Sequence, residues 1–122
     1  MEEEMKIEAF YQSVGGDYRE VSARLQSDAL IDKFLLKFPQ DPSYTDLQKA
    51  RAAGDIHAAF RAVHTLKGVA STLGLGRLAT AASALTEELR PLTAFPENCF
   101  FDAVATEYEA VLAAIRALQA DS

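Results

Sequence analysis

The sequence predicts an all-α fold, an antiparallel up-down four-helix bundle with a short additional N-terminal helix. Turn signals built from glycine, proline and aspartate divide the chain into segments. Within the segments, apolar residues recur in steps of three and four, the period of one buried helix face. No segment alternates apolar and polar residues as a half-buried strand does. We expect a single domain over residues 1–122 with a bundle core at about 17–119.

The first part of the chain predicts short helices. A leading helix around residues 4–13 would end at Gly15-Gly16. Asp17, with Glu20 three positions later, has the arrangement of a capping box and would start the next helix.

Proline residues define the end of that second helix. It would run from Tyr18 until Pro39 and Pro42 stop it, and Ser27-Asp28 could interrupt it. A further short helix is expected after the prolines, ending at Gly54.

The next helix has the most regular pattern in the chain. Asp55 can cap its start, and Gly74 suits its end because glycine tolerates the left-handed conformation. Its apolar positions are spaced as one buried face requires: Ile56, Ala59, Phe60, Val63, Leu66, Ala70 and Leu73. Two more helices are predicted, from Arg77 to Leu92 and from about Asn98 to Leu118.

Composition and charge exclude several classes of protein. Hydrophobic residues make up 49% and charged residues 25%, as in an ordinary soluble domain. A net charge of −6 argues against nucleic acid or an anionic membrane as the partner. No apolar run approaches the roughly 18 residues that span a bilayer, and the acidic start is unlike a signal peptide. Cys99 is the single cysteine, so no intrachain disulfide can form and we expect a reducing, cytoplasmic compartment. We also expect the protein to be a monomer.

The segment around His64 is the strongest functional signal. Lys67 and Gly68 follow it by three and four positions, so on a helix both lie beside the imidazole. A helical wheel places His64 roughly 120° from the apolar face, on a strip shared with His57, Arg61, Gly68 and Ser71. A mid-helix glycine costs about 0.5–1 kcal/mol relative to alanine, so close approach by another molecule explains it best. The pattern suits an accessible histidine that carries an anion.

These residues resemble the signature of histidine-containing phosphotransfer (HPt) domains of two-component phosphorelays. That signature is a helical His-x-x-Lys-Gly with a glycine at the helix end, matched here by His64, Lys67, Gly68 and Gly74. The stretch from Asp55 to Leu89 is similar to the family's phosphoacceptor helix hairpin, and the likeness covers most of the chain.

The resemblance implies a role for each matching residue. His64 would accept a phosphoryl group from a receiver-domain aspartate, or from a sensor histidine kinase, and pass it to a response regulator. Lys67 would stabilise phosphate oxygens and Gly68 would leave room for the receiver. The protein itself would need no cofactor, because the receiver domain would bring Mg²⁺. Ser83, Thr86 and Glu87 on the next helix could each orient the imidazole, and the sequence does not choose among them.

Three other interpretations compete with this one. A helical adaptor would have no use for this spacing of His64, Lys67 and Gly68. A phosphoacceptor module of a chemotaxis-type kinase would need a separate ATPase domain, and the chain has no Gly-rich nucleotide loop of its own. A metal enzyme in a helical bundle would use Glu-x-x-His pairs, which neither histidine forms. We therefore expect a phosphotransfer protein and no enzyme, with no metal site. His57 lacks a lysine at +3 and is interpreted as a solvated surface histidine.

Overall fold

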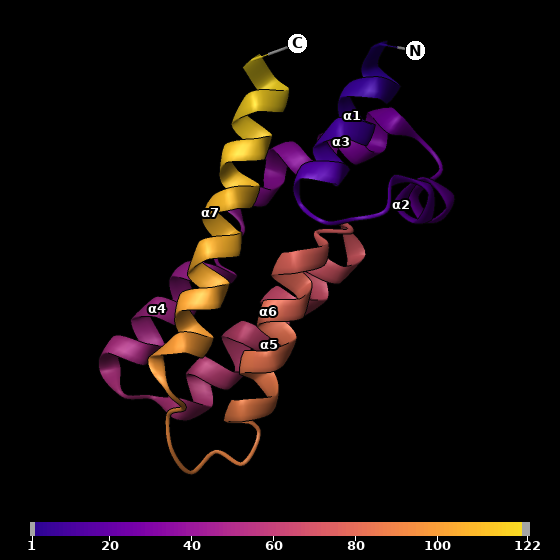
Figure 1. Ribbon diagram of the computed structural model, residues 1–122. Coiled ribbons are helices and arrows are strands. Elements are labelled where there is room, and N and C mark those ends of the chain that lie inside the picture. Colours follow the sequence, from indigo (N-terminus) through magenta and orange to yellow (C-terminus); the bar gives the residue numbers. More distant parts are fainter. Residues whose placement is uncertain (1, 121–122) are drawn as a thin grey trace.

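The computed structural model describes residues 2–120, with side chains described from Lys6 onward (Figure 1). All the regular elements in this part of the chain are helices, as the sequence predicts. They are α1 (Glu2–Ser13), α2 (Tyr18–Leu25), α3 (Asp28–Lys37), the 3-10 turn η1 (Phe38–Gln40), α4 (Ser43–Ala53), α5 (Ile56–Thr72), α6 (Gly76–Leu89) and α7 (Asn98–Ala120).

Helices α4 to α7 form the bundle. Each packs against the next along the chain, α4 on α5, α5 on α6 and α6 on α7. The connections α4–α5 and α5–α6 are short, so these successive helices run antiparallel. Helices α1 to α3 gather at the end of the bundle where α5 turns into α6, and α1 and α3 also pack on α7 (Figure 1). The additional N-terminal helix is therefore part of the packed structure.

The breaks in the first part of the chain follow local backbone chemistry. The side chain of Asp17 caps α2 by accepting a hydrogen bond from the backbone N–H of Arg19 at 2.9 Å. Glu20 completes no capping box, because its carboxylate lies 3.6 Å from Arg24 instead. The interruption expected at Ser27-Asp28 is present, with Ser27 as the N-cap of α3.

One helix end differs from the prediction. The sequence predicts a helix up to Leu92, whereas α6 ends at Leu89. Pro91 has no N–H to donate to the carbonyl of Glu87, and Leu92 takes a positive φ of 58°. The apolar spacing continues past the point where the backbone can remain helical.

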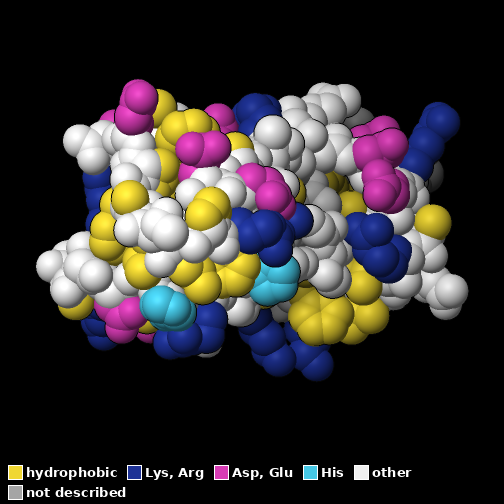
Figure 2. All heavy atoms as spheres, turned by 90° about the horizontal axis from the view of Figure 1, so that it is seen from below, with side chains coloured by type: hydrophobic (Ala, Val, Ile, Leu, Met, Phe, Trp, Pro, Cys, Tyr) yellow, Lys and Arg dark blue, Asp and Glu magenta, His cyan; other side chains and the backbone are white. Residues whose placement is uncertain are grey.

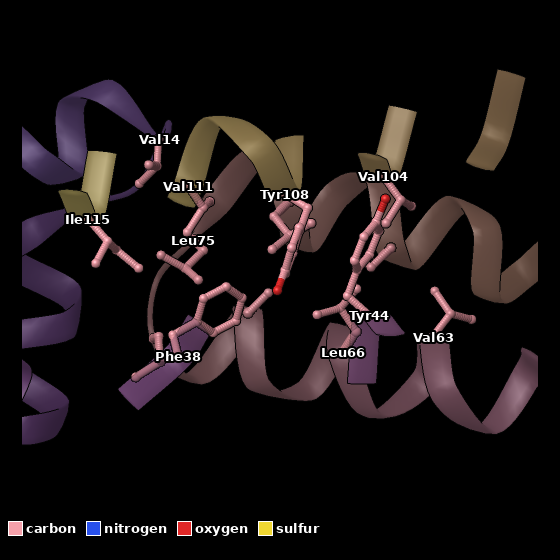
Figure 3. Packing of buried hydrophobic residues seen from close by; sticks show 14 of the residues in the cluster. Val14, Phe38, Tyr44, Val63, Leu66, Leu75, Val104, Tyr108, Val111 and Ile115 are labelled. Carbon is pink, nitrogen blue, oxygen red and sulfur yellow. The ribbon is translucent and has the colours of Figure 1, made fainter. Parts of the chain in front are cut away.

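The core is one cluster of buried hydrophobic residues to which all the helices contribute, and Figure 3 shows part of it. It contains an aromatic stack in which the ring centroids of Tyr44 and Tyr108 lie 4.0 Å apart and the planes are 14° from parallel. Phe38, just after α3, packs on Tyr108 at 5.8 Å. Burial raises the pKa of both tyrosines above the usual value. Val63 and Leu66 enter the same core from α5, so the helix that carries His64 is fixed by its opposite face (Figure 3).

Helices α1 and α2 are tied to the end of α5 by hydrogen bonds. The hydroxyl of Tyr11 donates to the carbonyl of Leu73 at 2.8 Å. The guanidinium of Arg24 donates to the carbonyls of Ser71 and Thr72, at 3.1 and 3.0 Å. The last carbonyls of a helix have no partner within it. Residues of α1 and α2 therefore supply the hydrogen-bond donors that these carbonyls lack within α5.

Candidate functional site

Both ends of helix α5 are fixed. Asp55 is its N-cap and accepts a hydrogen bond from the backbone N–H of Ala58 at 3.0 Å. Gly74 follows the C-cap residue Leu73 with φ 72°. Both residues act as the sequence predicts, and they leave His64 near the middle of a helix of 17 residues.

His64 lies on the exposed side of α5. Its neighbours Val63 and Leu66 are buried, whereas His57 and Gly68 are exposed along with it. The strip predicted by the helical wheel is therefore present. Figure 2 shows the histidine side chains on one face, with Lys and Arg side chains around them and a hydrophobic patch close by.

Gly68 has open space beside it. A Cβ added to this residue would meet no atom within 4 Å, and its φ is not positive. Neither packing nor backbone conformation within the protein requires a glycine here. Because Gly68 has no side chain, nothing projects from α5 at this point next to His64.

Lys67 is half-buried at the edge of the exposed strip. It forms no ion pair within the part of the chain that the structure describes. Its charge is nevertheless close enough to Glu87 on α6 to act on it. The hydrogen bond from Arg90 holds the pKa of Glu87 below its usual value, and the Lys67 charge lowers it further. A cation without a fixed partner thus lies one helical turn from the imidazole.

None of the three residues that the sequence offers to orient the imidazole, Ser83, Thr86 and Glu87, forms a hydrogen bond with it. The buried hydroxyl of Thr86 donates to the carbonyl of Ala82 at 2.7 Å. Glu87 accepts two hydrogen bonds from Arg90. Among the described residues, none forms a hydrogen bond with either ring nitrogen of His64, so Ser83 does not do so either.

An aromatic ring contacts the imidazole instead. Phe60 stacks on His64, with ring centroids 5.9 Å apart and planes 10° from parallel. The sequence places Phe60 on the buried face, but the structure leaves it half-buried at the edge of that face. The signal that could have found it is its spacing, because a residue four positions before His64 lies beside it on a helix.

A groove lies next to Gly68, between α5 and α3. Its volume is about 560 Å³, and its apolar lining includes Phe34, Val69 and Leu73. Phe34 is 37% exposed and Leu30, also on α3, is 36% exposed. Large side chains of this kind are normally buried, and an exposed apolar patch beside a polar site is typical of a protein-docking surface.

Two further features bear on the class of site. No group of three or more His, Cys, Asp or Glu side chains placed to hold a metal ion occurs among the described residues. In the same part of the chain, none of the helices combines the length and the apolar character needed to cross a bilayer.

The fold and the site together define a helical bundle that presents a histidine, with a neighbouring cation and an open glycine, on one exposed face. A model of the Hpt domain family matches residues 29–120, which is most of the chain and includes the whole bundle. The chain therefore belongs to the Hpt domain family, whose members carry phosphoryl groups on histidine in phosphorelays. No curated protein and no solved structure matches it. Helices α1 and α2 lie outside the family match.

Proposed function

We propose that this protein is a phosphorelay intermediary in which His64 is the phosphoacceptor. The observation that supports this most is the exposure of His64 in the middle of helix α5, with Lys67 and the open Gly68 one helical turn away. The histidine would take its phosphoryl group from a receiver-domain aspartate or from a sensor histidine kinase. It would then pass the group to a response regulator.

The transfer step uses ordinary imidazole chemistry. The lone pair of one ring nitrogen attacks the phosphorus of an aspartyl phosphate, so that an N–P bond forms while the P–O bond to the aspartate breaks. The carboxylate leaves with the bonding electrons, and the imidazole keeps the proton on its other nitrogen until water takes it. A neutral imidazole carries a lone pair on one ring nitrogen, which makes that nitrogen a competent nucleophile. In the second transfer, the same steps run in reverse toward another receiver.

Lys67 supplies the positive charge that the step needs. A phosphoryl group on His64 would bring negative charge to the exposed strip of α5, where a nearby cation can offset it. The Lys67 ammonium, three residues away and without an ion-pair partner among the described residues, can reach the phosphate oxygens. Mg²⁺ would come with the receiver domain.

The surface around His64 suits a receiver domain in shape. Gly68 keeps the surface low, and the groove beside it offers apolar area for docking. The exposed rings and methyl groups of Phe34 and Leu30 extend that area onto α3. A folded partner could thus bring its phosphoaspartate to the imidazole while burying apolar surface next to it.

Transfer from phosphorylated receivers tests the proposal. The purified protein is mixed with each radiolabelled, phosphorylated receiver domain of the same organism. Separate samples contain each of its sensor kinases with labelled ATP, or labelled ATP alone. We expect label to move from at least one receiver to this chain as an acid-labile, base-stable adduct, and none from ATP. If none of the receivers and none of the organism's sensor kinases gives up label to the chain, it is a helical adaptor and the proposal is wrong.

A further inference from the structure

The imidazole of His64 stacks on one aromatic ring in the described part of the chain, and this neighbour is on its own helix. The Phe60 and His64 rings are 5.9 Å apart and nearly parallel, at 10°. Aromatic pairs at this separation and in offset, parallel geometry attract each other. The phenyl ring therefore restricts rotation of the imidazole on one side.

Phe60 is itself held by a cation from the end of α6. The guanidinium carbon of Arg90 lies 5.6 Å from the centroid of the Phe60 ring, within the range of a cation–π contact. Glu87 binds this guanidinium through two hydrogen bonds, of 2.9 and 3.0 Å. Two bonds orient a planar guanidinium as one bond does not. Glu87, Arg90, Phe60 and His64 thus form a row of contacts from α6 to α5, which we call the stacking row.

The stacking row matters because hydrogen bonds do not fix the imidazole. Neither ring nitrogen of His64 has a hydrogen bond within the described part of the chain. The ion pair at the far end is exposed and contributes little to stability. The stacking row can instead fix the orientation of the imidazole. Orientation matters because phosphoryl transfer depends on the alignment of the attacking nitrogen.

We propose that Phe60 is a positioning residue for His64, holding the imidazole in the orientation from which its nitrogen attacks, and that Arg90 and Glu87 hold Phe60 in place. The effect on phosphotransfer rests on the proposed function. The orientation of the imidazole can be measured without any partner. Helix α6 thereby has a role in the site through Glu87 and Arg90, with no hydrogen bond from α6 to the imidazole.

The first experiment measures the order of the imidazole by NMR relaxation of the histidine ring carbons. His57 is the reference within the same molecule, because it lies on the same exposed strip and stacks on no aromatic ring among the described residues. We expect His64 to be more ordered than His57, and Phe60→Leu to lower its order to the level of His57. Phe60→Tyr keeps the ring and should keep the order. An unchanged His64 order in Phe60→Leu would overturn the proposal.

Charge variants test the second half of the row. Arg90→Gln should lower the order of the His64 ring by a smaller amount than Phe60→Leu does. Arg61→Gln is the matched control. Arg61 is an exposed cation that follows Phe60 in the sequence and is not part of the stacking row, so this variant should leave the order of the His64 ring unchanged. Equal effects of the two variants would show that general charge, and not the stacking row, acts on the imidazole.

The second experiment separates positioning from docking. Transfer from a phosphorylated receiver is followed over a range of receiver concentrations. In Phe60→Leu, the maximal rate should fall about fivefold, because a freed imidazole divides its time among several χ1 and ring orientations. The half-saturating concentration should stay constant, and Phe60→Tyr should restore the rate. A raised half-saturating concentration with an unchanged maximal rate would make Phe60 a docking residue and contradict positioning.

Failure of the proposed function gives a different result. In that case the wild-type protein takes no label from any receiver, while the ring-order measurements still decide whether Phe60 positions His64.

Discussion

The hydroxyl of Tyr11 donates a buried 2.8 Å hydrogen bond to the carbonyl oxygen of Leu73, the C-cap residue of helix α5. This bond joins α1, outside the family match, to the helix that carries His64. The carbonyl of a C-cap residue has no partner within its own helix. Through this bond the first helix supports the end of the helix that carries His64.

Replacing Tyr11 by phenylalanine should destabilise the protein without affecting transfer. The substitution leaves a buried carbonyl unpaired, which costs about 1–2 kcal/mol in the free energy of unfolding. Urea unfolding measures the cost, and phosphotransfer by the folded variant is the control. A variant as stable as the wild type would show that α1 does not support α5 through this bond.

The stability difference between the wild type and Tyr11→Phe should depend on pH. Burial raises the pKa of Tyr11, and the charge of Arg24 lowers it by less. Above about pH 10, tyrosine loses its proton in the unfolded state but keeps it in the folded state, so the free energy of unfolding falls as the pH rises. The stability difference between the wild type and Tyr11→Phe should therefore shrink above pH 10.

Two glycines with the same backbone conformation should respond differently to alanine. Gly54 and Gly74 have φ values of 69° and 72°. A Cβ at Gly54 would meet nothing within 4 Å, whereas one at Gly74 would overlap the Val21 side chain and press on Tyr11. Gly54→Ala should cost about 1–2 kcal/mol from backbone strain alone. Gly74→Ala should cost at least about 1 kcal/mol more through overpacking, and thermal melting compares the two.

Equal costs at the two positions would contradict this account. They would mean that the Val21 side chain can move away from a Cβ at Gly74 at no energetic cost.

Much of the fold could be predicted because its signals are local. The Asp55 cap, the Gly74 end and the three-four spacing between them define α5 without reference to the rest of the chain. The end of α6 could not be read from apolar spacing, because the effect of Pro91 on the backbone outweighs the contribution of Leu92 to the seam.

The candidate site was predicted in part for the same reason. Spacing along one helix places His64, Lys67 and Gly68 together. The contact of Phe60 with Arg90 depends on how α6 packs against α5, and sequence spacing carries no information about packing between helices. The groove beside Gly68 likewise depends on the position of α3.

Gly68 separates stability from function. Because an added Cβ would meet no atom within 4 Å and φ is not positive, Gly68→Ala should stabilise the protein by about 0.5–1 kcal/mol on helix propensity. Gly68→Gln should stay folded and transfer phosphate more slowly, because its side chain would stand on the surface that we propose for receiver docking. Melting temperature and receiver-to-histidine transfer are measured on the same samples. Wild-type transfer by Gly68→Gln would show that the position needs no open space.

Lys67→Ala should slow phosphotransfer by about tenfold while leaving the helix content unchanged. A charge-assisted bond to a phosphate oxygen contributes roughly 1.5–3 kcal/mol, and part of it is made in the transition state. Lys67→Arg, which keeps the charge, is the control and should retain most of the rate. Circular dichroism checks the fold, and a loss of helix with normal transfer per folded molecule would make Lys67 a structural residue.

Transfer to two single-histidine variants shows whether His64 carries the phosphoryl group. His64→Gln and His57→Gln are each mixed with the same labelled, phosphorylated receiver, and circular dichroism confirms that both are folded. Both histidines lie on the exposed strip of α5, so each variant controls for the exposure of the other. We expect His57→Gln to accept label at the wild-type rate and His64→Gln to accept none. Label retained by His64→Gln would mean that another residue carries the phosphoryl group.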